Sequence, residues 1–335
     1  MKLIMFQGKT VLITGGTGSL GYHLTKRMLK MKIRSIRIFS RDEWKQTQMF
    51  EQLNDNRLRF LIGDIRDKER LSTAMENVDI VIHAAALKHV PIAEYNAFEA
   101  IKTNVLGSQN VVECCLMQNV EKAIAIGTDK AASPFNTYGA TKLLMEKIFT
   151  SARFVKGKHK TKFITVRYGN VLGSRGSILP KFTEQIQNKN TITITDPKMT
   201  RFNITMNQAI DLIFRALEQG RGGEIFVPKL KAYTVETMKD AILEIMNKKS
   251  KIKKIPIRQG EKFHETLISE EEANFVYTTK YDYIIQNQGI NNIVPKQEVT
   301  FSKAKLKSSY NSNTAELLTK DELKELILKE GLLIK

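Results

Sequence analysis

Tyr138 and Lys142 are the first residues whose types and spacing point to a chemistry. They stand four residues apart in a segment with helical periodicity, so we expect them to share one helix face. A phenol with an unperturbed pKa of about 10 is a poor base at neutral pH, and a neighbouring ammonium lowers that pKa. The pair could therefore remove the proton of a sugar or alcohol hydroxyl. A helix with a packed tyrosine and a solvated lysine has the same spacing. Other features of the sequence are therefore needed to support a catalytic role for the pair.

A second reactive group, Thr128, Asp129 and Lys130, directly follows the apolar run 123–126. A short uninterrupted apolar run predicts a buried parallel strand, and the polar residues after it predict a functional edge. An adjacent carboxyl and amine can serve as general acid and general base. For a lysine to act as a base, burial or a nearby cation has to lower its pKa.

A glycine-rich turn, GGTGSLG, follows the β-branched run 10–14 and precedes a helical segment. Gly15 permits a tight turn, Gly18 lets the backbone approach a pyrophosphate, and Gly21 lets the helix pack on the strand. The N-terminus of the helix then binds the anion. The pattern therefore predicts a dinucleotide site.

The apolar run 33–39 predicts the second strand of this site, and Ser40, Arg41 and Asp42 follow it. At this position an acid selects NAD, whereas an arginine accommodates the additional phosphate of NADP. Because Arg41 is the first charged residue, we favour NADP, and Asp42 leaves NAD possible.

Further strands are predicted at 58–62, ending at Asp64, and at 79–83, followed by the small residues Ala84 to Ala86. Lys88 lies in the loop after the latter strand, and a long helix is expected from this loop to Met117. Strands that alternate with helices indicate an α/β fold with a Rossmann-type doubly wound parallel sheet, whose ligands bind at the carboxyl edge.

Beyond about residue 172 the alternation loosens, so we expect residues 1–172 to form the cofactor-binding domain. Residues 173–335 are expected to form a smaller α/β substrate-binding region, with a strand at 223–227 that returns to the sheet or lies near it. Asn170 lies in a glycine-rich loop after a strand at 162–166. Arg201 and Arg258 lie in later loops and suit bidentate phosphate contacts.

The chain of 335 residues carries a formal charge of +18, which attracts polyanions. Its lysines and arginines are spread along the sequence apart from the run 248–254, and no nucleic-acid-binding motif accompanies them, so we expect no nucleic-acid partner. The two adjacent cysteines and the five histidines lack metal-ligand spacing, so we expect no metal. Without an apolar run of about 18 residues or a signal-peptide pattern, we expect a cytosolic protein without a membrane segment.

A set of motifs resembles the extended short-chain dehydrogenase/reductase superfamily and, within it, the inverting UDP-N-acetylglucosamine 4,6-dehydratases of bacterial pseudaminic acid synthesis. Asp129 is followed by Lys130, whereas the other branch of 4,6-dehydratases has Glu there, and Tyr138 argues against a capsule-forming group that carries Met. Gly127 departs from the serine usual in the family. The motifs are TGGTGSLG, SRDE, GDIRD, HAAALKHVPIAEYN, KTNVLGSQNV, TDKAASPFNTYGATK, RYGNVLGSRGS, MTRF and RQGEKFHE.

The resemblance, together with the patterns above, implies a set of site residues. Catalytic roles are implied for Thr128, Asp129, Lys130, Tyr138 and Lys142. Substrate contacts are implied for Lys88, Asn170, Arg201, Arg258 and Glu261. Cofactor contacts are implied for Gly15, Thr17, Gly18, Ser19, Leu20, Gly21, Ser40, Arg41, Asp42, Lys45, Asp64, Ile65, Ala84, Ala85, Lys88, Tyr138 and Lys142.

The implied reaction oxidises C4 of UDP-N-acetylglucosamine, eliminates water across C5 and C6, and reduces C6 with the same cofactor. Tyr138 would take the 4-hydroxyl proton, Lys130 would be the C5 base and Asp129 the C6 acid, although exchanged roles for the last two fit the sequence equally well. The resemblance also suggests a homo-oligomer, plausibly a hexamer. A UDP-sugar 4-epimerase or reductase, or a dehydratase serving capsule or lipopolysaccharide, are the alternatives.

Overall fold

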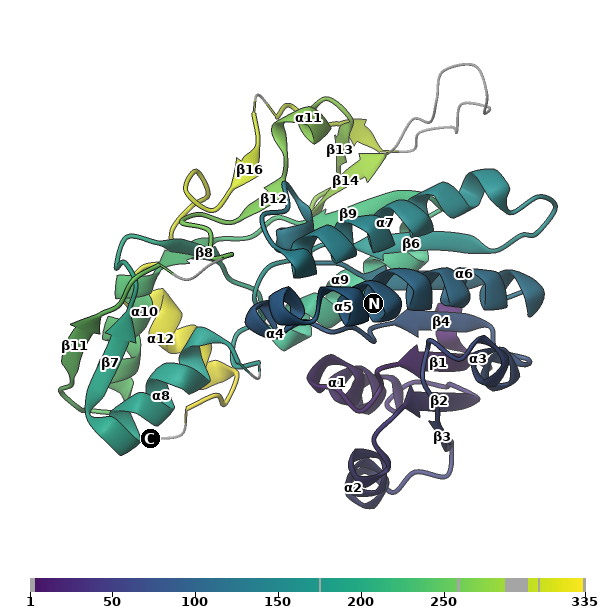
Figure 1. Ribbon diagram of the computed structural model, residues 1–335, viewed down its shortest axis with the longest axis horizontal. Coiled ribbons are helices and arrows are strands. Elements are labelled where there is room, and N and C mark those ends of the chain that lie inside the picture. Colours follow the sequence, from purple (N-terminus) through teal and green to yellow (C-terminus); the bar gives the residue numbers. More distant parts are fainter. Residues whose placement is uncertain (1–3, 175, 258–259, 287–300, 307, 334–335) are drawn as a thin grey trace.

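A ten-stranded sheet forms the centre of the protein in a computed structural model that describes residues 4–174, 176–257, 260–286, 301–306 and 308–333. The strand order is β15-β13-β14-β9-β6-β5-β4-β1-β2-β3, and the strands from β3 to β9 pair in parallel. This is the order of a Rossmann-type sheet, so the predicted fold class is confirmed (Figure 1). The parallel strands are β1 (Thr10–Thr14), β2 (Ser35–Ser40), β3 (Leu58–Ile62), β4 (Ile80–His83), β5 (Lys122–Ile126), β6 (Lys162–Val166) and β9 (Glu224–Pro228).

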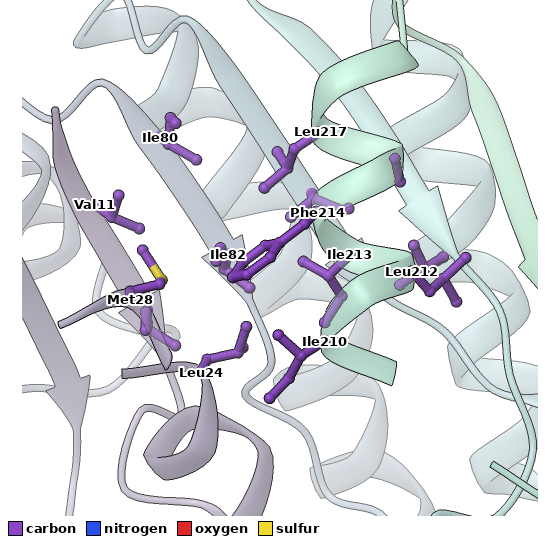
Figure 2. Close-up of a cluster of buried hydrophobic side chains, with 14 of the residues drawn as sticks. Val11, Leu24, Met28, Ile80, Ile82, Ile210, Leu212, Ile213, Phe214 and Leu217 are labelled. Carbon is purple, nitrogen blue, oxygen red and sulfur yellow. The ribbon is translucent and has the colours of Figure 1, made fainter. Parts of the chain in front are cut away.

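Helices cover both faces of the parallel part of the sheet. On β1, Val11 and Ile13 enter one hydrophobic core while Leu12 enters the other, as the period of two in a strand requires. Helices α1 (Ser19–Met28), α2 (Glu43–Leu53) and α9 (Met206–Gln219) cover the first face, and α3 (Lys68–Met75), α6 (Gly107–Met117) and α7 (Thr137–Val155) cover the second. Figure 2 shows the first core, where Leu24 and Met28 of α1 meet Ile210, Phe214 and Leu217 of α9 over Val11, Ile80 and Ile82.

The long helix predicted to end at Met117 is interrupted. It consists of α4 (Val90–Tyr95), α5 (Ala97–Ile101), the π-helical turn η2 (Lys102–Leu106) and α6. Asn96 has non-helical backbone angles (φ −120°, ψ 53°) and separates α4 from α5. Within η2, the Asn104 side chain pairs with both backbone groups of Leu87 in the loop after β4. The interruption therefore ties the helix to that loop.

The C-terminal half adds a second group of elements with its own hydrophobic core, which Figure 1 shows beside the main sheet. Its helices α8 (Ile178–Lys189), α10 (Val235–Ile245) and α12 (Lys320–Lys329) pack with β7 (Thr191–Ile194), which pairs with β11 (Lys251–Lys254). Two further short pairs are β8 (Thr200–Phe202) with β10 (Ala232–Thr234), and β12 (Thr266–Ile268) with β16 (Tyr310–Asn311).

The predicted return of the chain to the main sheet occurs at β9, which pairs in parallel with β6. The sheet then continues with antiparallel strands that were not predicted, β14 (Asp282–Gln286), β13 (Val276–Thr278) and β15 (Ser302–Lys303), which lie near the short helix α11 (Glu270–Ala273). None of the helices in the described part of the chain combines the length and apolar composition needed to cross a membrane.

Candidate active site

The glycine turn between β1 and α1 packs closely against the backbone around it. Gly15 has a left-handed φ of +66°, and a Cβ there would lie 2.8 Å from the backbone of Ala85. A Cβ on Gly21 would lie 2.3 Å from the carbonyl of Gly16, so that only glycine lets α1 start this close to the turn. Thr17, Gly18, Ser19 and Leu20 complete the turn and the first residues of α1. The turn therefore fits a pyrophosphate at the start of the ten-residue helix α1.

The predicted ribose-binding residues gather at the ends of β2 and β3. Asp42 caps α2 by accepting a hydrogen bond from the backbone N–H of Lys45, and it also forms an ion pair with the Lys45 ammonium. Arg41 lies with its Nη1 3.6 Å from Oδ2 of Asp64, and more than half of its side chain is exposed. Ser40 ends β2 and Ile65 is buried after Asp64. Asp42 is thus already paired with Lys45, whereas the Arg41 guanidinium beside Asp64 is still partly accessible to a ligand.

Small residues at the end of β4 complete this side of the site. The backbone N–H of Ala84 donates to the carbonyl of Thr14, and that of Ala85 donates to the Thr14 hydroxyl. Lys88 lies on the exposed loop that follows. The structure therefore brings the ends of β1 and β4 together in the way the sequence predicted.

Tyr138 and Lys142 lie in the first two turns of α7. Asn136 caps this helix by accepting from the backbone N–H of Gly139, and its amide donates to the carbonyl of Gly260. Lys142 is 3% exposed, and its ammonium donates to the sulfur of Met145 at 2.9 Å. The helix start is therefore held by a segment more than 100 residues away in the chain.

The predicted lowering of the Tyr138 pKa by Lys142 is not found. Burial raises the pKa of Tyr138 to about 12, and the charge of Lys130 and a hydrogen bond with Thr128 offset only part of that effect. Burial lowers the pKa of Lys142 to about 8, against the opposing effect of Glu146. The cation that favours the tyrosinate in this structure is thus Lys130.

Thr128, Asp129 and Lys130 follow β5 and form a compact polar group at the start of the 3₁₀ turn η3 (Asp129–Ala131). The Thr128 hydroxyl donates to Asp129 Oδ1 at 2.8 Å, and the Lys130 ammonium donates to the same oxygen at 3.0 Å. Asp129 is fully buried, and its Oδ2 has no hydrogen-bond partner. An unpartnered buried carboxylate oxygen is costly, and a substrate hydroxyl could satisfy it.

Three of the predicted substrate residues lie around this group. Asn170 follows Gly169, at which a Cβ would lie 3.4 Å from Asp129 Oδ2. Arg201 of β8 is buried, and its Nη2 lies 3.5 Å from Glu261 Oε1. Arg258 lies outside the described residues. An open hollow of about 590 Å³ is lined by residues 133–135 and 261–264.

Glu265 is a residue of the site that the sequence analysis missed. It is 4% exposed, and its Oε1 lies 3.7 Å from the Lys130 ammonium and 3.6 Å from Arg201 Nε. Lys262 of the same segment donates to the carbonyls of Ala132 and Ser133. Glu265 ends the motif RQGEKFHE, but nothing in that motif shows which of its charged residues faces the catalytic group.

The charge state of Lys130 also differs from expectation. Burial lowers the pKa of Lys130, but the carboxylates of Asp129 and Glu265 raise it by more, so that the net shift is upward. Lys130 is therefore an ammonium in this arrangement, and it has to lose a proton before it can act as a base.

The glycine-rich turn, the helix with Tyr138 and Lys142, and the Asp129–Lys130 pair lie at one edge of a Rossmann-type sheet. Residues 11–287 match the model of the family described as polysaccharide biosynthesis protein. The chain belongs to this family.

Curated relatives carry two kinds of name. The UDP-N-acetylglucosamine 4,6-dehydratase (inverting) of Campylobacter jejuni is 47% identical over 283 residues, which cover 84% of this chain and 84% of that protein. A protein of Rickettsia bellii named UDP-glucose 4-epimerase is 43% identical over 329 residues, which cover 97% of this chain and 96% of that protein. The predicted resemblance to the inverting dehydratases is thus confirmed, and epimerase names accompany it.

Solved structures agree on the fold. Pen from Bacillus thuringiensis superposes with a TM-score of 0.88 at 39% identity, covering 97% of this chain and 99% of that chain. A dTDP-glucose 4,6-dehydratase of Streptomyces venezuelae, solved with NAD bound, gives a TM-score of 0.69 at 21% identity, covering 76% of this chain and 86% of that one. The second likeness concerns the fold alone.

Proposed function

We propose that this chain is a UDP-N-acetylglucosamine 4,6-dehydratase that inverts C5 and releases a UDP-2-acetamido-2,6-dideoxy-4-keto-hexose. The observation that carries the proposal is the hydrogen-bonded Asp129–Lys130 pair, whose ammonium also acts on Tyr138. An epimerase needs only a group that removes and returns the 4-hydroxyl proton. An elimination needs an acid and a base in addition, and this pair provides both.

The residues fit a nicotinamide dinucleotide because Gly15, with its left-handed φ of +66°, lets the turn lie against the backbone of Ala84 and Ala85 at the start of α1, where backbone N–H groups can meet a pyrophosphate. Gly15, Gly18, Ala84 and Ala85 would hold it, and Tyr138 and Lys142 would face its reactive end. When bound, this cofactor accepts a hydride from C4 of the sugar and returns it to C6. We propose NADP rather than NAD, since Asp42 is paired with Lys45, whereas the Arg41 guanidinium lies 3.6 Å from Asp64 with more than half of its side chain exposed.

Tyr138 removes the 4-hydroxyl proton in this proposal, and Thr128, its hydrogen-bond partner, holds the same oxygen. The resulting 4-ketone acidifies the C5 proton. Lys130, as the neutral amine, takes the C5 proton while Asp129 gives a proton to the 6-hydroxyl, so that the C6–O bond breaks and water leaves. C5 later regains a proton as the 4-hydroxyl proton is released, and the net change is the loss of one water.

The geometry favours Lys130 as base and Asp129 as acid over the exchanged roles. Asp129 Oδ2 is buried without a partner, whereas Oδ1 accepts from Thr128 and Lys130, so a proton on Oδ2 would leave the contact with Lys130 intact and could be given to a hydroxyl that reaches it. Arg201 and Glu261, with Asn170 on the neighbouring loop, would bind the nucleotide-sugar part of the substrate. The role of Arg258, the division at residue 172, the homo-oligomer and the pathway that uses the product stay predictions.

A 4-epimerase is the second candidate, because relatives with that name match 97% of the chain. Incubation of the purified protein with NADP and UDP-N-acetylglucosamine, followed by mass spectrometry, separates the two functions. The dehydratase forms a product lighter by one water. A product of unchanged mass with inverted C4 would instead support the epimerase.

A further inference from the structure

Glu265 lies against the base of the proposed reaction, yet the mechanism above gives it no task. It comes from the segment before β12, some 135 residues after Lys130, and it is as buried as a core residue. Its backbone is fixed on both sides by Ser312, whose hydroxyl pairs with the Glu265 N–H and whose own N–H donates to the Glu265 carbonyl. The carboxylate is therefore held in place and does not swing into solvent.

The two oxygens of the Glu265 carboxylate have different surroundings. Oε1 faces two cations, the ammonium of Lys130 at 3.7 Å and Nε of Arg201 at 3.6 Å. Oε2 is buried and has no hydrogen-bond partner. Because Oε1 lies beside the ammonium and Oε2 has no partner, the carboxylate can store a proton, and the cost of leaving Oε2 unpartnered disappears once a proton or a hydroxyl reaches it.

The charges around Glu265 favour a proton there. From η3 it faces Asp129 and Lys130, from β8 Arg201, from β10 Tyr233 and from its own segment Lys262. Burial and the negative charge of Asp129 raise the pKa of Glu265, and the three cations oppose them only in part. Two buried carboxylates that flank one ammonium hold a proton more readily than either alone.

We propose that Glu265 accepts the proton that Lys130 must lose before it can take the C5 proton of the substrate. The inference rests on the proposed function. The cycle starts with one proton on the pair of carboxyl groups, at Asp129, with Lys130 as the ammonium and Glu265 as the carboxylate. The step then converts the Lys130 ammonium and the Glu265 carboxylate into an amine and a carboxylic acid. After the elimination Lys130 is again an ammonium and Asp129 a carboxylate. Lys130 then passes its proton to Asp129 and recovers one from Glu265, so that all three groups return to their starting state without a co-reactant.

Glu265 is thus a positioning residue that acts through Lys130, and Glu265→Gln tests it because the amide has the same shape and cannot accept the proton. At about pH 7 we expect a fall in kcat of about 100-fold, within the range for loss of an acid–base partner. The kcat of the variant should increase close to tenfold for each unit by which the pH is raised, since solvent must now remove the Lys130 proton. The kcat of the natural protein should vary much less.

Three comparisons separate this role from a structural one. C4 oxidation does not use Glu265, so a single turnover of the variant should accumulate absorbance at about 340 nm from the reduced cofactor. Glu265→Asp keeps a carboxylate and should restore the shallow pH profile at a lower rate. Glu270→Gln, an exposed change in the same segment, should leave kcat unchanged. A loss that is equal at every pH, or a variant with normal kcat, overturns the proposal.

A measurement without substrate makes the inference independent of the proposed function. In protein labelled at the lysine Cε, an NMR titration should place the Lys130 midpoint about one pH unit or more lower in Glu265→Gln than in the natural protein. Lys130→Arg assigns the signal. An unmoved midpoint overturns the link between the two residues. A moved midpoint in a protein that eliminates no water from UDP-N-acetylglucosamine would leave the link standing and reject the proposed function.

Discussion

At the scale of single residues, the site separates the two halves of the proposed reaction between two side chains. Tyr138 lies next to Thr128 and serves the 4-hydroxyl, whereas Lys130 lies between two carboxylates and serves C5. The neighbours of Tyr138 suit the proposed transfer of the 4-hydroxyl proton, and those of Lys130 suit the proposed transfer of the C5 proton. The two halves should therefore fail separately when one side chain is removed.

Substitution of Tyr138 and Lys130 tests that separation. Tyr138→Phe should block C4 oxidation, so that no absorbance at about 340 nm appears in a single turnover with NADP. Lys130→Met should keep this absorbance and lose at least about 100-fold in the rate of water release. Both variants should bind NADP. Water release at the natural rate by either variant would remove that residue from the mechanism.

His83 gives a prediction about stability. Burial and the charge of Lys142 lower its pKa to about 3, and it hydrogen-bonds Thr14 and Ser108. Between about pH 6.5 and pH 3 the unfolded chain binds a proton at this site and the folded protein does not. The free energy of unfolding therefore decreases as the pH falls through this window, by on the order of 5 kcal/mol across the whole window.

The measurement is chemical denaturation at several pH values in that window. His83→Gln should flatten the acid dependence, whatever its effect at neutral pH, whereas His159→Gln, an exposed histidine, should leave the dependence as in the natural protein. An equal slope for His83→Gln and the natural protein would show that His83 is not the group responsible.

At the scale of elements, the turn between β1 and α1 shows what sequence reasoning predicts well. The strand, the glycine spacing and the helix are local in sequence, and all three lie where they were predicted. The contact that makes Gly15 necessary is with Ala85, which follows β4, and the sequence pattern only implied it. Local patterns therefore predict the element, and the fold provides the reason for each glycine.

Gly15→Ala and Gly8→Ala form a matched pair for this turn. Both glycines have a left-handed φ, +66° and +69°, but only Gly15 has a neighbour that a Cβ would strike. Gly15→Ala should weaken NADP binding by about 100-fold or more, because the backbone has to move away from the ligand. Gly8→Ala should cost about 1 kcal/mol of stability and leave binding unchanged. Calorimetric titration with NADP measures the affinity of each variant, and equal affinities for the two variants would contradict the predicted loss in Gly15→Ala.

Prediction fails for the elements that depend on distant pairing. The strands β13 and β15 have only three and two residues, and they exist because β14 adds to β9 in the antiparallel sense. The interrupted helix before α6 likewise depends on the contacts of Asn104 with Leu87 and Thr141. Neither pattern has a local signature, and Glu265 was missed for the same reason.

At the scale of the whole molecule, Arg167 joins the catalytic helix to the C-terminal part of the chain. It follows β6, is fully buried, and binds Glu146 of α7, Glu272 of α11 and the carbonyl of Leu267. Glu146 also lies beside Lys142, whose charge it stabilises. The pairing therefore connects the position of the Tyr–Lys helix to segments that carry Glu265 and its neighbours.

Removal of this arginine should be costly because the buried Glu146 and the partly buried Glu272 lose their cation. We expect Arg167→Met to lower the free energy of unfolding by about 3–5 kcal/mol. The control is Arg27→Met, which breaks the partly exposed pair with Asp211 between α1 and α9 and should cost less than about 1 kcal/mol. Urea denaturation measures both. A loss for Arg167→Met as small as that of the control would show that the buried network does not stabilise the fold.

The proposed transfer of hydride from C4 to C6 is tested most directly with a deuterium label at C4. UDP-N-acetylglucosamine that carries deuterium at C4 is incubated with the protein and NADP, and the product is analysed by mass spectrometry and NMR. We expect a product lighter by one water, with the deuterium on the C6 methyl group and a ketone at C4. Deuterium that stays at C4 in a product of unchanged mass would contradict this expectation.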